Sequence, residues 1–202
     1  VCSRLTVSLT AMAPVLRHTN RTVRQLVCPN SIINESRIVL RFFLTEIAME
    51  TLNELFEEQI KDLYSAENQL LKALPKMAKK ASSGDLKKGF ELHTKQTQGH
   101  VSRLEEIAKM WEFKPTGKKC KAMEGLIEEG KEVIEEDGDE SVIDAALIAA
   151  AQRVEHYEIS AYGSARALAD RLGCEETASL LQSTLDEESD TDKILTKLSV
   201  GT

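Results

Sequence analysis

Several acidic and histidine side chains occupy positions where an amphipathic helix would carry apolar residues. At about 100° per residue, Glu67 projects onto the same helical face as Leu63 and Leu70. A carboxylate in the middle of an apolar stripe is costly unless it is paired or binds a metal ion. The other candidates of this kind lie further along the chain: His93, Glu155, Glu158 and Glu188, with His100 and Glu187 as secondary candidates.

Such a ligand set would suit a dinuclear metal centre. Carboxylates and imidazoles that project inward from four helices at one level are the ligands of di-iron and di-manganese bundles. Carboxylate oxygen with imidazole nitrogen favours iron, manganese or zinc, and no cysteine is placed to make the site rich in thiolate. The usual Glu-x-x-His motif is absent, and the chain carries Glu155-x-x-Glu158 instead.

Each candidate also has a simpler interpretation. A single glutamate on a helical stripe is most often a boundary residue whose carboxylate reaches water. A single inward histidine is more often part of the core than a ligand. The fourth histidine, His156, projects about 100° away from Glu155 and is not a candidate. The prediction of a site therefore depends on the coincidence of inward polar groups on all four long helices.

The hydrophobic period from residue 49 onward predicts the helices that must position these groups. Apolar stripes at steps of three and four residues place helices at about 51–81, 85–111, 123–136, 141–172 and 175–198. Pro75 should kink the first helix. Gly173 is suited to the left-handed residue that follows the fourth.

The lengths of the connections predict the topology. Short turns make the first two helices one antiparallel hairpin and the last two another. The connection between the hairpins is about thirty residues long and can travel the length of the bundle. We therefore expect an all-α protein with a ferritin-like four-helix bundle and a short extra helix in the crossover.

Composition agrees with this fold and excludes several functions. The chain has 202 residues, and its low content of glycine (10), proline (4) and aromatic residues (4%) argues against sandwiches, barrels and propellers. A net charge of −7 argues against nucleic-acid binding. No apolar run is long enough to span a membrane.

Charge divides the chain into two segments. Residues 1–48 contain six arginines, no lysine and two acidic residues, whereas residues 49–202 are strongly acidic. An arginine-rich, acid-poor composition is typical of organelle transit peptides. The alternatives are an upstream extension outside the native coding sequence and a true accessory segment. We assign residues 1–48 to an N-terminal extension outside the core and residues 49–202 to the bundle.

The sequences of four stretches resemble the YciF-type family of bacterial ferritin-like stress proteins. The similarity covers about residues 50–198. The stretches are LYSAENQLLKALPKMAKKA (63–81), CKAMEGLIEEG (120–130), DAALIAAAQRVEHYEISAYGSARALADRLG (144–173) and LLQSTLDEESDTDKILTKL (180–198).

This resemblance implies a cytoplasmic homodimer with a buried site for two metal ions, iron first and manganese or zinc as alternatives. It implies as ligands Glu67, His93, Glu155, Glu158 and Glu188. The second helix departs from the family pattern, because Gln96 stands where relatives often have glutamate. His100 could substitute for the missing carboxylate. The expected chemistry is reaction with dioxygen or peroxide, or oxidation of Fe(II), with Tyr64, Tyr157 and Tyr162 as redox neighbours.

The alternative is a metal-free helical module for stress or protein interaction. It would keep the bundle and use the glutamates in hydrogen bonds or ion pairs, with Lys61, Lys72 and Lys76 as partners. Cys120 and Cys174 are expected to be reduced thiols, because the chain shows no secretory signal.

Overall fold

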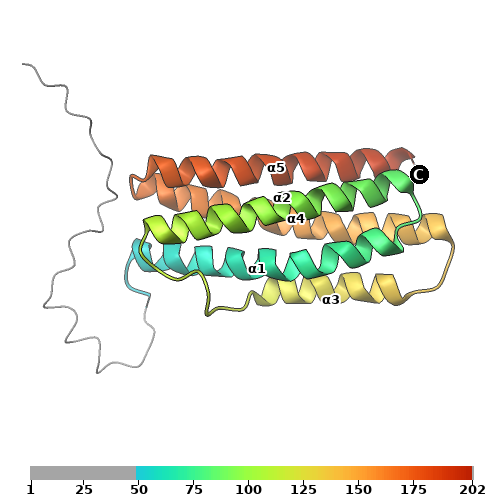
Figure 1. Ribbon diagram of the computed structural model, residues 1–202, viewed down its shortest axis with the longest axis horizontal. Coiled ribbons are helices and arrows are strands. Elements are labelled where there is room, and N and C mark those ends of the chain that lie inside the picture. The colour runs from blue at the N-terminus through green and yellow to red at the C-terminus, as the bar shows by residue number, and fades with distance from the viewer. Residues whose placement is uncertain (1–48, 202) are drawn as a thin grey trace, which may run out of the picture.

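The computed structural model describes residues 49–201, so the predicted extension 1–48 lies outside the described residues. Within them the chain folds into five α-helices and no strand (Figure 1). The predicted all-α, ferritin-like four-helix bundle is confirmed. The helices are α1 (Leu52–Lys80), α2 (Gly84–Met110), α3 (Lys121–Glu135), α4 (Glu140–Arg171) and α5 (Glu175–Gly201).

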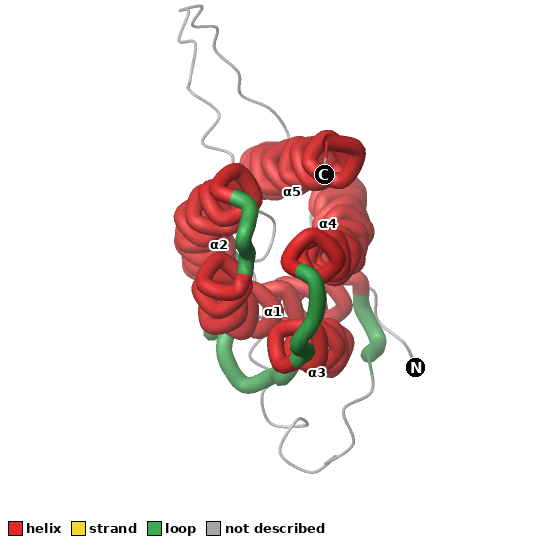
Figure 2. Tube along the Cα trace, turned by 90° about the vertical axis from the view of Figure 1, so that its right-hand side faces the viewer, coloured by secondary structure: helices red, strands yellow, loops and turns green. Residues whose placement is uncertain are grey.

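Two antiparallel hairpins build the bundle, one of α1 and α2 and the other of α4 and α5 (Figure 1). The long crossover returns along the bundle, so α2 and α4 run in the same direction. It carries α3, which packs against α1 and α4 on the outside of the four-helix core (Figure 2). No helix among residues 49–201 is long and apolar enough to cross a membrane.

Local sequence signals fix where the helices begin and end. Thr51 and Glu54 form a capping box at the start of α1, with each side chain accepting from the other's backbone N–H. Helix α1 then continues through Pro75 to its end. Gly173 adopts φ +75° directly after α4, as the sequence predicts.

A buried acid supports the turn between α1 and α2. Asp144 of α4 accepts from the backbone N–H of Ser82 and of Ser83, at 2.9 and 2.7 Å, and from the Ser82 hydroxyl at 2.7 Å. Burial alone would raise the pKa of Asp144, but these three donors outweigh it and lower the pKa. This carboxylate therefore ties the two hairpins together at one end of the bundle.

The apolar core consists of two clusters, one at each end of the bundle. One includes Leu70 and Phe90, and the other includes Leu63, Leu104 and Tyr162. On α2 the buried residues between these clusters are His93, Thr97 and His100, and on α1 the buried Glu67 lies between Leu63 and Leu70. The bundle therefore has a polar layer at mid-length, closed above and below by packed apolar side chains.

Candidate metal centre

The polar layer is built from six side chains that come from all four long helices. Each is at most 2% exposed. The first hairpin and the second hairpin contribute three side chains each. From α1 and α2 these are Glu67, His93 and His100, and from α4 and α5 they are Glu155, Glu158 and Glu188.

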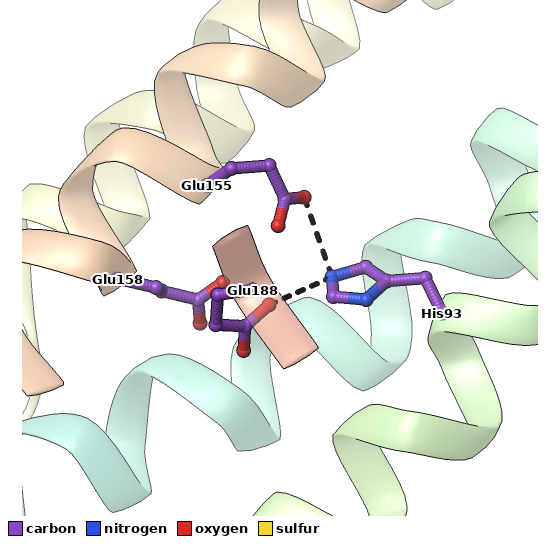
Figure 3. Close-up of side chains that lie close together, drawn as sticks. All are labelled: His93, Glu155, Glu158 and Glu188. Atoms are coloured by element: carbon purple, nitrogen blue, oxygen red, sulfur yellow. Dashed lines mark ion pairs between the residues drawn. The ribbon is translucent and has the colours of Figure 1, made fainter. Parts of the chain in front are cut away.

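Four of the side chains form a first group (Figure 3). It consists of His93, Glu155, Glu158 and Glu188, and one potential ligand atom from each lies within 4.8 Å of the others. His93 Nε2 lies 3.3 Å from Glu155 Oε1 and 3.7 Å from Glu188 Oε2. One imidazole nitrogen and three carboxylates therefore converge on one point.

A second group lies beside the first and consists of Glu67, His100 and Glu188. His100 Nδ1 lies 2.9 Å from Glu188 Oε1 and 3.5 Å from Glu67 Oε1. Glu188 belongs to both groups. A carboxylate shared in this way can serve two neighbouring metal positions.

Buried polar atoms of the layer that make no hydrogen bond support metal binding. Eight buried side-chain atoms in the layer make no hydrogen bond. Four of them, His93 Nε2, His100 Nδ1 and both oxygens of Glu188, lie at ion-pair distance from another side chain of the layer. Glu158 is the extreme case, because neither of its oxygens makes a hydrogen bond or an ion pair with a described residue. Most buried polar atoms in folded proteins are hydrogen-bonded, and leaving one unsatisfied costs about 1–3 kcal/mol. The donor set, four carboxylates and two imidazoles, suits iron, manganese or zinc.

Two acids of the first group, Glu155 and Glu158, hold their protons strongly. Burial, followed by the charges of neighbouring carboxylates, raises the pKa of both Glu155 and Glu158 well above the usual value. Burial also lowers the pKa of His93, so its imidazole is neutral. A divalent cation here would displace protons from the carboxylates and meet an imidazole that is already unprotonated.

In contrast to His93, His100 has a raised pKa. Burial alone would lower its pKa, but Glu188 and Glu67 together outweigh burial and raise the pKa to about 10. In return, His100 and His93 hold the pKa of Glu188 below its usual value, despite the opposing effect of burial. In the metal-free protein, a charged imidazole and a carboxylate therefore neutralise each other within the layer.

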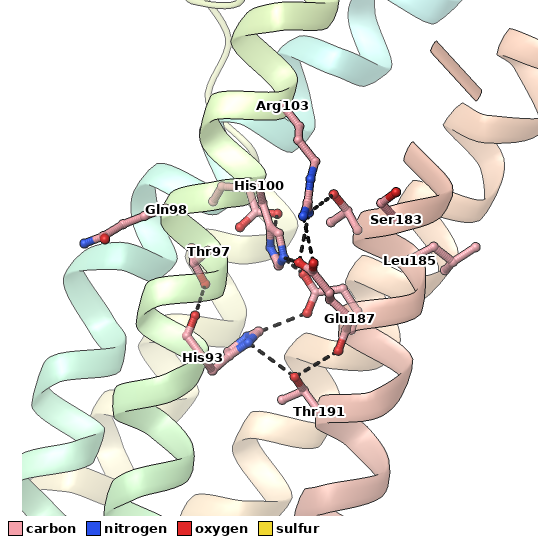
Figure 4. Close-up of polar contacts among 12 residues, drawn as sticks. His93, Thr97, Gln98, His100, Arg103, Ser183, Leu185, Glu187 and Thr191 are labelled. Carbon is pink, nitrogen blue, oxygen red and sulfur yellow. Dashed lines mark hydrogen bonds and ion pairs between the residues drawn. The ribbon is translucent and has the colours of Figure 1, made fainter. Parts of the chain in front are cut away.

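Side chains outside the layer hold the two imidazoles in place (Figure 4). Glu187 lies 2.8 Å from His100 Nε2, on the side away from Glu188. Arg103 donates to both carboxylate oxygens of Glu187, at 2.9 and 2.7 Å. Thr191 lies 3.4 Å from His93 Nδ1 and donates to the Glu187 backbone carbonyl at 3.0 Å. Such outer contacts fix the orientation of metal-binding histidines.

The structure brings together the five main candidate residues and the secondary candidate His100. The other secondary candidate, Glu187, lies outside both groups, with a side chain that is 32% exposed. Gln96 lines a small hollow beside His93 and belongs to neither group. His156 is largely exposed, in agreement with its exclusion.

Sequence reasoning missed the supporting residues Arg103 and Thr191. Arg103 follows His100 by three residues and therefore shares its side of the helix, which is the one signal that could have identified it. Neither residue type suggests metal support by itself.

The tyrosines differ in their relation to the layer. Tyr162 donates to Glu67 Oε1 at 2.5 Å and is fully buried. Tyr157 donates instead to Asp62 and contacts the Cys120 thiol at 2.9 Å. Tyr64 donates to Glu105 at an exposed position. Only Tyr162 among these three directly contacts a residue of the layer.

The ion-pair partners proposed for a metal-free module do not reach the layer. Lys61 pairs with Glu57 and Glu58 of its own helix. Lys72 and Lys76 form no ion pair with any described residue, and both line a groove on the outside of the bundle. Within residues 49–201, three of the buried glutamates of the layer pair with the two histidines, of which His100 carries the charge. Cys120 and Cys174 are free thiols, as predicted.

Comparison with known proteins places these features in context. The family model described as "Domain of unknown function (DUF892)" matches residues 51–202. Protein YciF of Escherichia coli (strain K12) is 46% identical over 154 residues, which cover 76% of this chain and 93% of YciF.

Solved structures give the same result. The crystal structure of the E. coli stress protein YciF has a TM-score of 0.73 and 46% identity, covering 75% of this chain and 96% of that one. YcfI from Rhodopseudomonas palustris has a TM-score of 0.73 and 38% identity, covering 76% and 98%. Ferritin-like, diiron-carboxylate proteins from Bacillus anthracis str. Ames have a TM-score of 0.59 at 18% identity, covering 75% and 99%, and this likeness shows the fold alone.

Proposed function

The chain belongs to the YciF-type family, and from that premise we propose that it is a stress-associated protein with a buried dinuclear metal centre. The proposed chemistry is reaction with dioxygen or peroxide, or oxidation of Fe(II). One observation carries the proposal. Carboxylates and imidazoles converge from four helices, and several of the buried carboxylate oxygens, both of Glu158 included, lack the hydrogen bonds that a purely structural role requires.

From the two groups we infer two metal positions. His93, Glu155 and Glu158 would hold one ion, and Glu67 and His100 the other, with Glu188 common to both. Iron is the first choice, with manganese or zinc as alternatives that the same ligand types accept. A bound pair of iron or manganese ions would supply the electron-transfer chemistry, which no side chain in the layer supplies alone.

The chain's own residues would prepare and protect the centre. Arg103 and Glu187 hold the His100 ring so that Nδ1 faces the layer. The Tyr162 hydroxyl orients Glu67 through its hydrogen bond. Apolar clusters at both ends exclude bulk water from the layer. Only small molecules such as dioxygen or peroxide suit so enclosed a site.

The proposal includes a homodimer in the cytoplasm, as the family resemblance implies. Light scattering of the purified full chain tests the dimer directly. A mass corresponding to one chain at micromolar concentration would contradict that part of the proposal and leave the metal centre unaffected.

Metal analysis of the full chain purified without chelator tests the centre. We expect up to about two iron or manganese ions per chain after reconstitution. Glu158→Ala and Glu188→Ala should lose metal, whereas His156→Ala should retain it, because His156 is an exposed histidine of α4. Less than about a tenth of an ion per reconstituted chain would favour the metal-free module. Consumption of dioxygen or peroxide by the loaded protein then tests the chemistry.

A further inference from the structure

A groove of about 380 Å³ runs along the outside of the four-helix core, where α3 packs against α1 and α4. Its walls are mainly apolar, with Leu70 and Met77 from α1, Ile127 and Ile134 from α3, and Val154 from α4. The volume lies within the range of about 300–1,000 Å³ that is typical of small-molecule sites. The extra helix α3 therefore encloses a space that four helices alone would leave open.

Small residues on the three helices keep this groove hollow. Ala73 lies on α1, Gly130 on α3 and Ala150 on α4, and all three line the groove. A Cβ atom added at Gly130 would lie 4.0 Å from Ala150 Cβ, so α3 and α4 approach closely there. Larger side chains at these positions would occupy the groove.

Unpaired cations lie along the α1 side of the groove. Lys72 and Lys76 are one helical turn apart, both are exposed, and neither forms an ion pair with a described residue. Lys131 also lines the groove, but it lies 3.4 Å from Glu135, the one acidic lining residue. In a chain with a net charge of −7, this groove is therefore locally favourable for an anion.

We propose that the α1–α3–α4 groove binds a fatty acid, with its acyl chain against the apolar walls and its carboxylate between Lys72 and Lys76. The lining residues of α1 span 69–77, or about 12 Å at 1.5 Å per residue. That length suits an acyl chain of medium length. A stable protein interface covers about 800 Å² per partner, far more than a groove two helical turns long provides.

Isothermal titration calorimetry of the full chain with sodium dodecanoate, below its micelle concentration, tests this proposal. We expect saturable binding of about one dodecanoate per chain. Reversing both charges, in Lys72→Glu/Lys76→Glu, should weaken binding at least about tenfold. The matched control Lys87→Glu/Lys95→Glu carries the same charge change on exposed lysines of α2, and should bind as the wild type does.

Ala73→Phe tests the apolar part of the site, because its ring would fill the groove. We expect it to abolish binding while circular dichroism and metal content stay as in the wild type. Equal affinity of wild type, charge-reversed and filled variants would overturn the proposal, as would an absence of saturable binding up to about 1 mM. Binding only to phosphatidylglycerol vesicles, or a change of oligomeric state in place of dodecanoate binding, would equally overturn it. These outcomes are independent of the metal centre, because no groove residue belongs to either metal-binding group.

Discussion

Replacing Glu158 by methionine should stabilise the metal-free protein and abolish metal binding at the first group. Glu158 is fully buried, and neither of its carboxyl oxygens has a hydrogen-bond partner. Each unsatisfied buried polar group costs about 1–3 kcal/mol. Methionine has a similar volume and no such requirement. The free energy of unfolding of the chelator-treated protein should therefore rise by about 1–3 kcal/mol.

Thermal unfolding of matched samples measures this effect. For a protein of this size, 1 kcal/mol corresponds to about 2–4 °C in Tm, so the variant should melt about 2–12 °C above the metal-free wild type. With iron or manganese added, the order should reverse, because the wild type gains the binding free energy of the metal at the first group and the variant does not. The diagnostic result is a variant with a higher Tm than the wild type without metal and a lower Tm with metal.

Asp144→Leu is the matched control, because Asp144 is also a buried acid of α4. It accepts three hydrogen bonds from Ser82 and Ser83, so its loss should cost at least about 2 kcal/mol with or without metal. If Glu158→Met destabilised the metal-free protein in the same way, the carboxylates of the layer would be structural. The proposed metal centre would then be wrong.

Three further predictions concern the surroundings of the layer. Neighbouring acids raise the pKa of His100 from 6.5 to about 10. The ion pairs of His100 therefore stabilise the metal-free protein fully below about pH 6.5, and this stabilisation is lost as the pH rises through about 10. The fall in Tm over that pH range should be smaller in His100→Gln than in the wild type. Arg103→Ala should weaken metal binding about 10–100-fold in a metal titration, whereas Arg166→Ala, at an exposed pair, should not. Thr177→Val leaves the buried Trp111 indole N–H without its acceptor and should cost about 1–3 kcal/mol in chemical denaturation, with metal content unchanged.

The sequence predicts the fold well because a helical bundle follows from periodicity and loop length. The 3.6-residue period places all five helices to within two or three residues of their observed ends. The long crossover determines that α2 and α4 are parallel, since its residues can travel the length of the bundle. These features depend on neighbouring residues in the sequence, which pattern analysis can examine directly.

The same reasoning gives the main candidates for the site but not its electrostatics. Glu67 stands out because a charge interrupts an apolar stripe. The opposite pKa shifts of His93 and His100 depend on distances between helices, which one helix's period does not contain. Arg103 reaches Glu187 across two hairpins and looks like an ordinary surface cation in the sequence. A residue that supports the site only through another residue is not marked by the hydrophobic period of its helix.

The equal division of the six layer side chains between the hairpins has a kinetic consequence. A metal pair held there would be a non-covalent cross-link between two halves of the chain that are joined by one long crossover. Neither hairpin alone supplies a complete group, since both groups draw on both hairpins. Departure of the metal would therefore require the hairpins to separate. Exchange of a bound metal for an isotope in solution should then proceed at the rate at which the bundle opens. The rate of metal exchange would therefore measure the rate of this opening.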